Sequence, residues 1–274
     1  MPIKTCGHTM GTPGMDIFQA IDFFSDIGHD GIEIRCAADG LLDLETADQR
    51  LLSRIRDHAA RAGIEIACVT PYYREFVTPE ERSSTLAGLR RAMEAAVALG
   101  CSRVRLNAGT WPLRDVSRER AWSATVAGVR EACRDAAERG VFLCVENHVG
   151  TLTYTARETV DFVEAVGSEH VGILYDHYFV AQAGKESIDE ALAMQAPYLR
   201  HVHVKDARLN PATGEYETCV VGQGEMDWPR IVRGLKDVGY EGYLSDEYEK
   251  HWRPELPEPE DGMRRSAAFL RRLI

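Results

Sequence analysis

Three carboxylates and one imidazole each stand at the end of a short apolar stretch of the chain. They are Glu146 in VFLCVENH, Asp176 in VGILYDHY, His203 in LRHVHVKD and Glu247 in YLSDEYE. Carboxylate and imidazole ligands in this combination are typical of a site that binds one divalent cation and keeps room for a substrate. The sequence therefore predicts a metal centre. An oxygen-rich set with a single histidine favours Mn²⁺, Mg²⁺ or Co²⁺, and Zn²⁺ remains the alternative.

The apolar stretches that carry these residues belong to a regular alternation of strands and helices. Strand-like composition recurs over residues 3–8, 31–35, 64–70, 102–107, 141–146, 171–176, 199–205 and 242–247. Most of the intervening segments have apolar residues three to four positions apart, the period of an amphipathic helix. A glycine closes six of these segments, at positions 28, 63, 100, 140, 167 and 239. Eight such units predict a single (β/α)₈ (TIM) barrel domain over residues 1–274. An open doubly wound sheet is the alternative, although no GxGxxG motif follows the first strand.

The alternation of side chains along a strand tests whether the four residues face one cavity. The positions of all four are compatible with the barrel interior, and strand ends are where such a barrel carries its chemistry. His201 shares a face with His203 one layer deeper, so we interpret it as a hydrogen-bonded core histidine. Glu33 and Arg103, on two other strands, are interpreted as charges that fill the barrel interior.

Other polar residues near the strand ends are candidates for substrate contact: His148, Lys205, Arg35 and Asn107. We interpret His148 either as a donor to a substrate oxygen or as an ordinary loop histidine. Lys205 either holds a ligand or balances the charge of the site. Arg35, Arg105 and Asn107 lie at the ends of two further strands, where they would meet substrate hydroxyls, a carboxylate or a phosphate. For each arginine a salt bridge at the rim is equally compatible.

Composition limits the class of partner. The net charge of −11 disfavours a nucleic acid, and no stretch approaches the ~18 consecutive apolar residues of a membrane span. The N-terminal sequence lacks the apolar core of a signal peptide, and the seven cysteines include no CxxC pair. We therefore expect reduced thiols and a cytoplasmic protein. A homodimer is the base-rate expectation for its assembly.

Several motifs resemble one family over essentially the whole chain. VENHVGTLTYT, HVHVKD, GQGEMDW and EYEKHW look like the xylose-isomerase-like barrel superfamily, and within it the sugar phosphate isomerase/epimerase group. The resemblance implies that the ligands are Glu146, Asp176, His203 and Glu247, with Glu146 and Glu247 as the acid/base pair. Ketose 3-epimerases carry a histidine where this chain has Phe179, and an arginine that Arg208 matches only approximately. These departures argue against a simple ketose 3-epimerase.

The chemistry that such a site suggests is proton transfer next to a carbonyl group, with a carbohydrate-like small molecule as substrate. One glutamate removes a proton from carbon and the other returns it, through an enediolate. The first hypothesis is an isomerase or epimerase of a keto-sugar or related polyol. The second is a lyase, either a dehydratase of the inosose or 3-dehydroshikimate type or a 3-keto-glycoside eliminase. The third is a non-catalytic metal-binding subunit.

Overall fold

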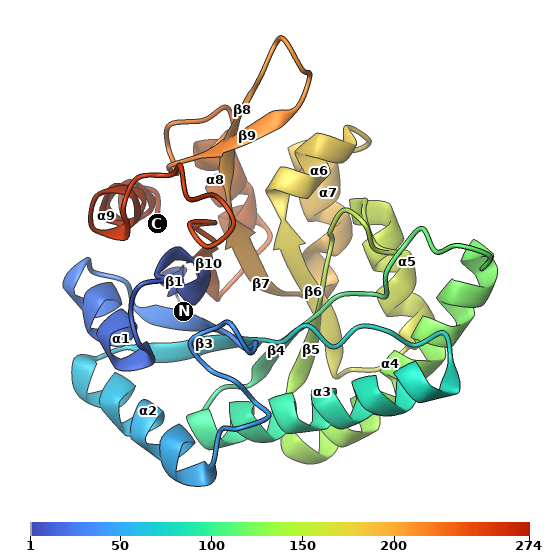
Figure 1. Ribbon diagram of the computed structural model, residues 1–274. Helices are drawn as coiled ribbons and strands as arrows, with labels where there is room; N and C mark the ends of the chain where they lie inside the picture. Colours follow the sequence, from blue (N-terminus) through green and yellow to red (C-terminus); the bar gives the residue numbers. More distant parts are fainter. Residues whose placement is uncertain (1) are drawn as a thin grey trace.

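The eight predicted strands are all present and form one closed parallel barrel (Figure 1). The computed structural model describes residues 2–274. The barrel strands are β1 (Lys4–His8), β2 (Gly31–Arg35), β3 (Glu65–Thr70), β4 (Arg103–Leu106), β5 (Phe142–Glu146), β6 (Val171–Asp176), β7 (Leu199–Val204) and β10 (Tyr243–Asp246). They follow one another around the barrel in chain order, and β10 closes it against β1. The prediction of a (β/α)₈ barrel is confirmed.

Helices surround the barrel on its outer side (Figure 1). The α-helices are α1 (Ile17–Asp26), α2 (Gln49–Ala62), α3 (Pro79–Leu99), α4 (Arg118–Arg139), α5 (Ala156–Val166), α6 (His177–Ala183), α7 (Ile188–Gln195), α8 (Trp228–Asp237) and α9 (Pro259–Leu270). Two short 3₁₀ turns are η1 (Thr9–Gly11) and η2 (Ala196–Tyr198). The apolar residues that face away from the barrel axis, such as Ile32, Ile34 and Val202, are fully buried beneath this layer.

Local sequence signals account for the helix ends. At the start of α3, the Thr78 hydroxyl accepts a hydrogen bond from the Glu81 amide, and the Glu81 carboxylate accepts one from the Thr78 amide. This capping box satisfies amide groups that the first helical turn leaves unpaired. At the other end of the helix, Gly100 adopts a left-handed φ of 77°. The other five glycines that the sequence marked as helix ends also have positive φ, so those ends are confirmed.

Three features differ from the sequence-based expectation. Residues 177–195 form α6 and α7, a pair that the periodicity did not reveal because Gly184 ends the first helix after two turns. A two-stranded antiparallel hairpin, β8 (Asp206–Leu209) and β9 (Tyr216–Cys219), follows β7 and projects beyond the barrel (Figure 1). The stretch 253–262, whose prolines and glutamates predict one long loop, is only partly loop, because α9 already begins at Pro259.

None of the helices in residues 2–274 combines the length and the apolar character that crossing a membrane requires.

Candidate active site

The four predicted ligands converge at the carboxyl ends of neighbouring strands. Glu146 ends β5, Asp176 ends β6, His203 lies in β7, and Glu247 follows β10 directly. One ligand atom from each lies within 4.8 Å of the others, and all four side chains are buried. The strand order around the barrel places Glu146 and Glu247 on opposite sides of the Asp176–His203 pair. Sequence reasoning therefore located the cluster correctly, and its metal-binding role stays a prediction.

Backbone contacts hold Asp176 in a defined orientation. The Asn147 side chain donates to the Asp176 carbonyl oxygen (2.7 Å) and accepts from its amide (2.9 Å). The Oδ1 atom of Asp176 then caps α6 by accepting from the Tyr178 amide at 2.9 Å. One carboxylate oxygen is thus used by the fold, and the other, Oδ2, is left for the cluster.

Glu146 is bound on both of its oxygens. Oε2 accepts from Arg105 Nε at 2.7 Å and from Asn107 Nδ2 at 3.1 Å, while Oε1 lies 3.1 Å from His203 Nδ1. Burial alone would raise the pKa of Glu146, but the Arg105 guanidinium and the nearby imidazoles outweigh it and hold that pKa well below its ordinary value. Glu146 is therefore an ionised carboxylate at neutral pH.

His203 and Lys205 bring positive charge to the remaining carboxylates. His203 Nδ1 lies 3.0 Å from Glu247 Oε2, and Lys205 Nζ lies 2.6 Å from the same oxygen and 3.0 Å from Asp176 Oδ2. Burial favours the neutral form of both bases, yet nearby carboxylates outweigh it. Glu247 and Glu33 hold the pKa of His203 well above its ordinary value, and Asp176 and Glu247 do the same for Lys205. Burial raises the pKa of Asp176, and His203 with Lys205 lowers that of Glu247.

The donor set fits a divalent cation. Asp176 Oδ2 and Glu247 Oε2 are buried and receive no well-aligned hydrogen bond, although the Lys205 ammonium is within ion-pair distance of both. Buried carboxylate oxygens normally have hydrogen-bond donors, so oxygens without them point to a missing ligand. His203 Nδ1 faces the same space, and the set of three carboxylates and one imidazole suits Mn²⁺, Mg²⁺ or Co²⁺.

The predicted substrate contacts fall into two groups. Asn107 and Lys205 touch the cluster directly, as described above, and His148 packs its ring 4.2 Å from that of Phe179, centroid to centroid. Arg35 lies at the rim, where it donates to Asp39 at 2.6 Å, so the salt bridge that the sequence left open is present. Arg208 is exposed on the hairpin and donates to the Gln223 carbonyl oxygen at 2.8 Å, which directs it away from the four ligands.

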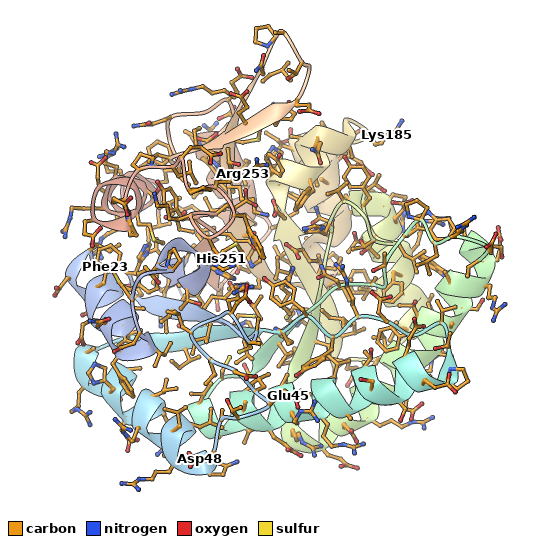
Figure 2. The ribbon with its side chains drawn as sticks, in the orientation of Figure 1. Phe23, Glu45, Asp48, Lys185, His251 and Arg253 are labelled. Carbon is orange, nitrogen blue, oxygen red and sulfur yellow. The ribbon has the colours of Figure 1, made fainter. Side chains whose placement is uncertain are left out.

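Aromatic side chains surround Arg35 at the rim. Its guanidinium lies 5.3 Å from the centroid of the Tyr72 ring and 5.2 Å from that of Trp252, which is 54% exposed. His251, labelled in Figure 2, joins this group from the connection between β10 and α9, with Nε2 3.1 Å from Asp39. The rim therefore offers exposed ring faces, and the charge of Arg35 is already paired with Asp39.

Asp206 explains the glycine-rich stretch GQGEMDW. Its carboxylate accepts from the backbone amides of Gly222 (2.8 Å), Gly224 (3.0 Å) and Met226 (3.1 Å). A Cβ on Gly224 would lie 2.0 Å from Asp206 Oδ1, so only glycine fits this approach. These three hydrogen bonds hold the segment against the residues that follow β7.

Sequence reasoning did not find two partners of the ligands. Arg105 was interpreted as a substrate contact or as part of a salt bridge at the rim, yet it forms a buried ion pair with Glu146. Glu33 was interpreted as a filling charge, yet its carboxylate lies 3.0 Å from His203 Nε2. The available signal was a charged residue inside an otherwise apolar strand, as in GIEIR.

Comparison with known proteins agrees with this geometry. A family model described as the xylose isomerase-like TIM barrel matches residues 21–273. The chain belongs to this family. The resemblance stated from the motifs is confirmed, and the members that this barrel is similar to include both epimerases and dehydratases.

A D-psicose 3-epimerase from Enterocloster bolteae is 26% identical over 240 residues, which cover 83% of this chain and 75% of the relative. An inosose dehydratase from Klebsiella pneumoniae is 30% identical over 156 residues, about half of each chain (52% and 51%). Among solved structures, a D-psicose 3-epimerase from Clostridium cellulolyticum has a TM-score of 0.82 at 20% identity, with 99% of this chain and 98% of that chain covered. This last likeness shows the fold. Both of these relatives are enzymes by name, one an epimerase and the other a dehydratase.

Proposed function

We propose that the protein is a divalent-metal-dependent isomerase or epimerase that acts on a keto-sugar or related polyol through an enediolate. The observation that carries the proposal is the cluster of Glu146, Asp176, His203 and Glu247, whose ligand atoms lie within 4.8 Å of one another. A bound cation would supply a Lewis acid for the carbonyl oxygen and an adjacent hydroxyl. The remaining chemistry belongs to the side chains.

Glu146 and Glu247 are the proposed acid/base pair. They come from β5 and from the end of β10, on either side of β6 and β7, so they approach a substrate in the centre from different directions. One removes the proton next to the carbonyl group, and the other returns a proton to the opposite face or to the adjacent carbon. Asn107 and Arg105 hold Glu146 in place, and Lys205 does the same for Glu247.

Substrate contacts are proposed for the remaining polar residues. Lys205, which contacts Asp176 and Glu247, and His148, which packs against Phe179, are suited to hydroxyl groups. Arg35 with Tyr72 and Trp252 offers a mixed polar and aromatic face at the rim. Arg208 would reach a substrate only after leaving the carbonyl of Gln223. A reducing, cytoplasmic setting agrees with the seven free cysteines, and the homodimer stays a prediction.

A lyase is the second candidate, and one local feature favours it. The Lys205 ammonium lies over the ring of Phe179, with Nζ 4.5 Å from the ring centroid. The same ammonium lies 2.6 Å from Glu247 and can act as a proton donor beside it. The same enolate could then expel a β-hydroxyl group that Lys205 protonates. The similarity to inosose dehydratase agrees with this alternative.

The test is solvent exchange at carbon. The protein, reconstituted with Mg²⁺, is incubated in D₂O with a panel of ketoses, inososes and 3-keto-glycosides, and deuterium next to the carbonyl group is read by NMR. A parallel set with Mn²⁺ is quenched and read by mass spectrometry. We expect deuterium uptake that EDTA abolishes. Unchanged product mass apart from deuterium identifies an isomerase or epimerase, whereas loss of water or an aglycone identifies a lyase. Exchange that persists in EDTA contradicts metal dependence, and a bound panel member that exchanges no proton favours the non-catalytic alternative.

A further inference from the structure

A single buried carboxylate, that of Glu33, lies beneath the four proposed ligands and is surrounded by hydrogen-bond donors. Oε2 lies 2.8 Å from His201 Nε2 and accepts from the Ser245 hydroxyl at 2.6 Å. Oε1 lies 3.0 Å from His203 Nε2 and also accepts a hydrogen bond from the Thr70 hydroxyl. These partners come from β3, β7 and β10, and all of them are fully buried.

His8 faces Glu33 from a longer distance, and the position of its ring proton follows from its other contact. The Met10 amide donates to His8 Nδ1 at 3.0 Å, so the lone pair of the ring is on Nδ1 and the proton of the neutral ring is on Nε2. That Nε2 atom has no hydrogen-bond partner and lies 3.7 Å from Glu33 Oε1. His8 therefore points a proton toward Glu33 rather than a lone pair toward a cation.

These contacts explain why Glu33 is charged although it is buried. Four donors contact its two oxygens, and hydrogen bonds to a buried carboxylate favour its charged form. Cys6 also lies close to Glu33 and His201. Burial holds the pKa of the Cys6 thiol well above its ordinary value, so it remains protonated. This lower layer is a hydrogen-bond network around one acceptor.

The two ring nitrogens of His203 face different layers. Nδ1 lies 3.1 Å from Glu146 Oε1 and 3.0 Å from Glu247 Oε2, in the proposed metal cluster. Nε2 faces Glu33. We propose that Glu33 is a positioning residue that keeps a proton on His203 Nε2 and so leaves the Nδ1 lone pair for the divalent cation. This inference rests on the proposed function, because it assigns a task to a residue that touches a ligand of that site.

The barrel wall is shaped to bring Glu33 to this place. The pairing of β2 with β3 shifts register at Glu33, because Ile32 pairs with Ile66 whereas Glu33 pairs with Cys68. On the other side, Glu33 pairs with His8 of β1. An ionised carboxylate can only accept hydrogen bonds, so it forces a proton onto every nitrogen that faces it. A neutral acceptor of the same shape would lack that control.

Glu33→Gln tests this role, because it keeps the shape of the side chain and replaces one acceptor oxygen with a donor. If the new NH₂ group faces His203, the ring must move its proton to Nδ1. If the NH₂ group faces His201, His203 keeps only a neutral acceptor. Partners of metal-bound histidines typically change metal affinity by 10–100-fold. We expect Mn²⁺ to bind Glu33→Gln at least about tenfold more weakly in an electron paramagnetic resonance titration. Glu65→Gln, which makes the same change at the far end of β3 next to Lys4, should bind like the wild type.

The second readout is the proton itself, and it needs no variant at Glu33. In wild-type protein labelled with ¹⁵N-histidine and loaded with Mg²⁺, the His203 ring, assigned through His203→Asn, should carry its proton on Nε2 and not on Nδ1. A proton on Nδ1, or equal Mn²⁺ affinity in Glu33→Gln and wild type, overturns the positioning role alone. A wild-type protein that binds neither Mn²⁺ nor Mg²⁺ overturns the proposed function and the positioning role together. If Glu33→Gln fails to fold, the position of the His203 ring proton in the wild-type protein still tests the positioning role.

Discussion

His29 should make the stability of the barrel depend on pH between 8 and 5. The residue is 5% exposed and neither ring nitrogen has a hydrogen-bond partner. Burial, helped by Arg271, lowers its pKa to about 3. In the unfolded chain the ring takes up a proton at its ordinary pKa of about 6.5. Between these two values the unfolded state binds more protons than the native state, so lower pH favours unfolding.

The size of the change in unfolding free energy follows from how far pH 5 lies below the pKa of histidine in the unfolded chain. At pH 5 the solution is about 1.5 units below the ordinary histidine value, and each unit corresponds to about 1.4 kcal/mol. The native pKa lies well below pH 5, so its exact value hardly matters. His29 should therefore lower the free energy of unfolding by about 2 kcal/mol on going from pH 8 to pH 5.

The assay compares wild type with His29→Leu, which has a side chain of similar volume and cannot take up a proton. Urea unfolding is followed by circular dichroism at both pH values, with EDTA present so that no cation contributes. The wild type should lose about 2 kcal/mol more than the variant over this pH interval. His8 and His177 also have pKa values lowered by burial, to about 4, but they are present in both proteins and cancel. Equal losses in the two proteins would refute the reasoning.

Three further predictions concern the site. Glu247→Gln should keep the fold and lower turnover by about 10²–10⁴-fold, measured as deuterium exchange on the best panel substrate, because it removes half of the acid/base pair; near-normal turnover would exclude that role, and Glu65→Gln is the matched control. His203→Ala should purify with less bound metal by elemental analysis, because it removes the only imidazole of the set; unchanged metal content would exclude it as a ligand. Lys205→Met should bind Mn²⁺ about tenfold or more tightly, because a buried ammonium no longer competes for Asp176 and Glu247, and its metal-free form should melt at a lower temperature. Weaker Mn²⁺ binding by Lys205→Met would show that the ammonium supports the cation instead of opposing it.

The features that were predictable from the sequence are those with a local cause. Gly63 and Gly100 end helices through their own backbone freedom, and the short apolar run of 141–146 favours a buried strand. Parity along each strand then placed Glu146 and His203 on the inner face without any knowledge of distances. The contacts between residues on different strands depend instead on the pairing register of the strands. Arg105 meets Glu146 because β4 pairs with β5 so that Arg105 lies beside Cys144, and no local pattern states that register.

The hairpin was missed for a different reason. Its turn signal is present, since Asn210, Pro211 and Gly214 stand between the two short strands, but a barrel pattern leads one to expect a helix after each strand. The broken helix pair α6–α7 escaped detection because each part is too short to show a clear period. In both cases the element lies in a connection between barrel strands, where the packing of the barrel constrains the local conformation of the chain least.

The hydrogen bonds of Glu33 also link cation binding to the closure of the barrel during folding. The ligands come from β5, β6, β7 and the end of β10, whereas Glu33 comes from β2 and reaches Ser245 of β10 across the closing seam beside β1. A ribosome-bound chain that ends before residue 247 lacks a ligand, and one whose two ends have not met lacks the group that orients His203. Full cation affinity would therefore report that the barrel has closed, and a protein cut between β3 and β4 should regain that affinity only when both fragments assemble.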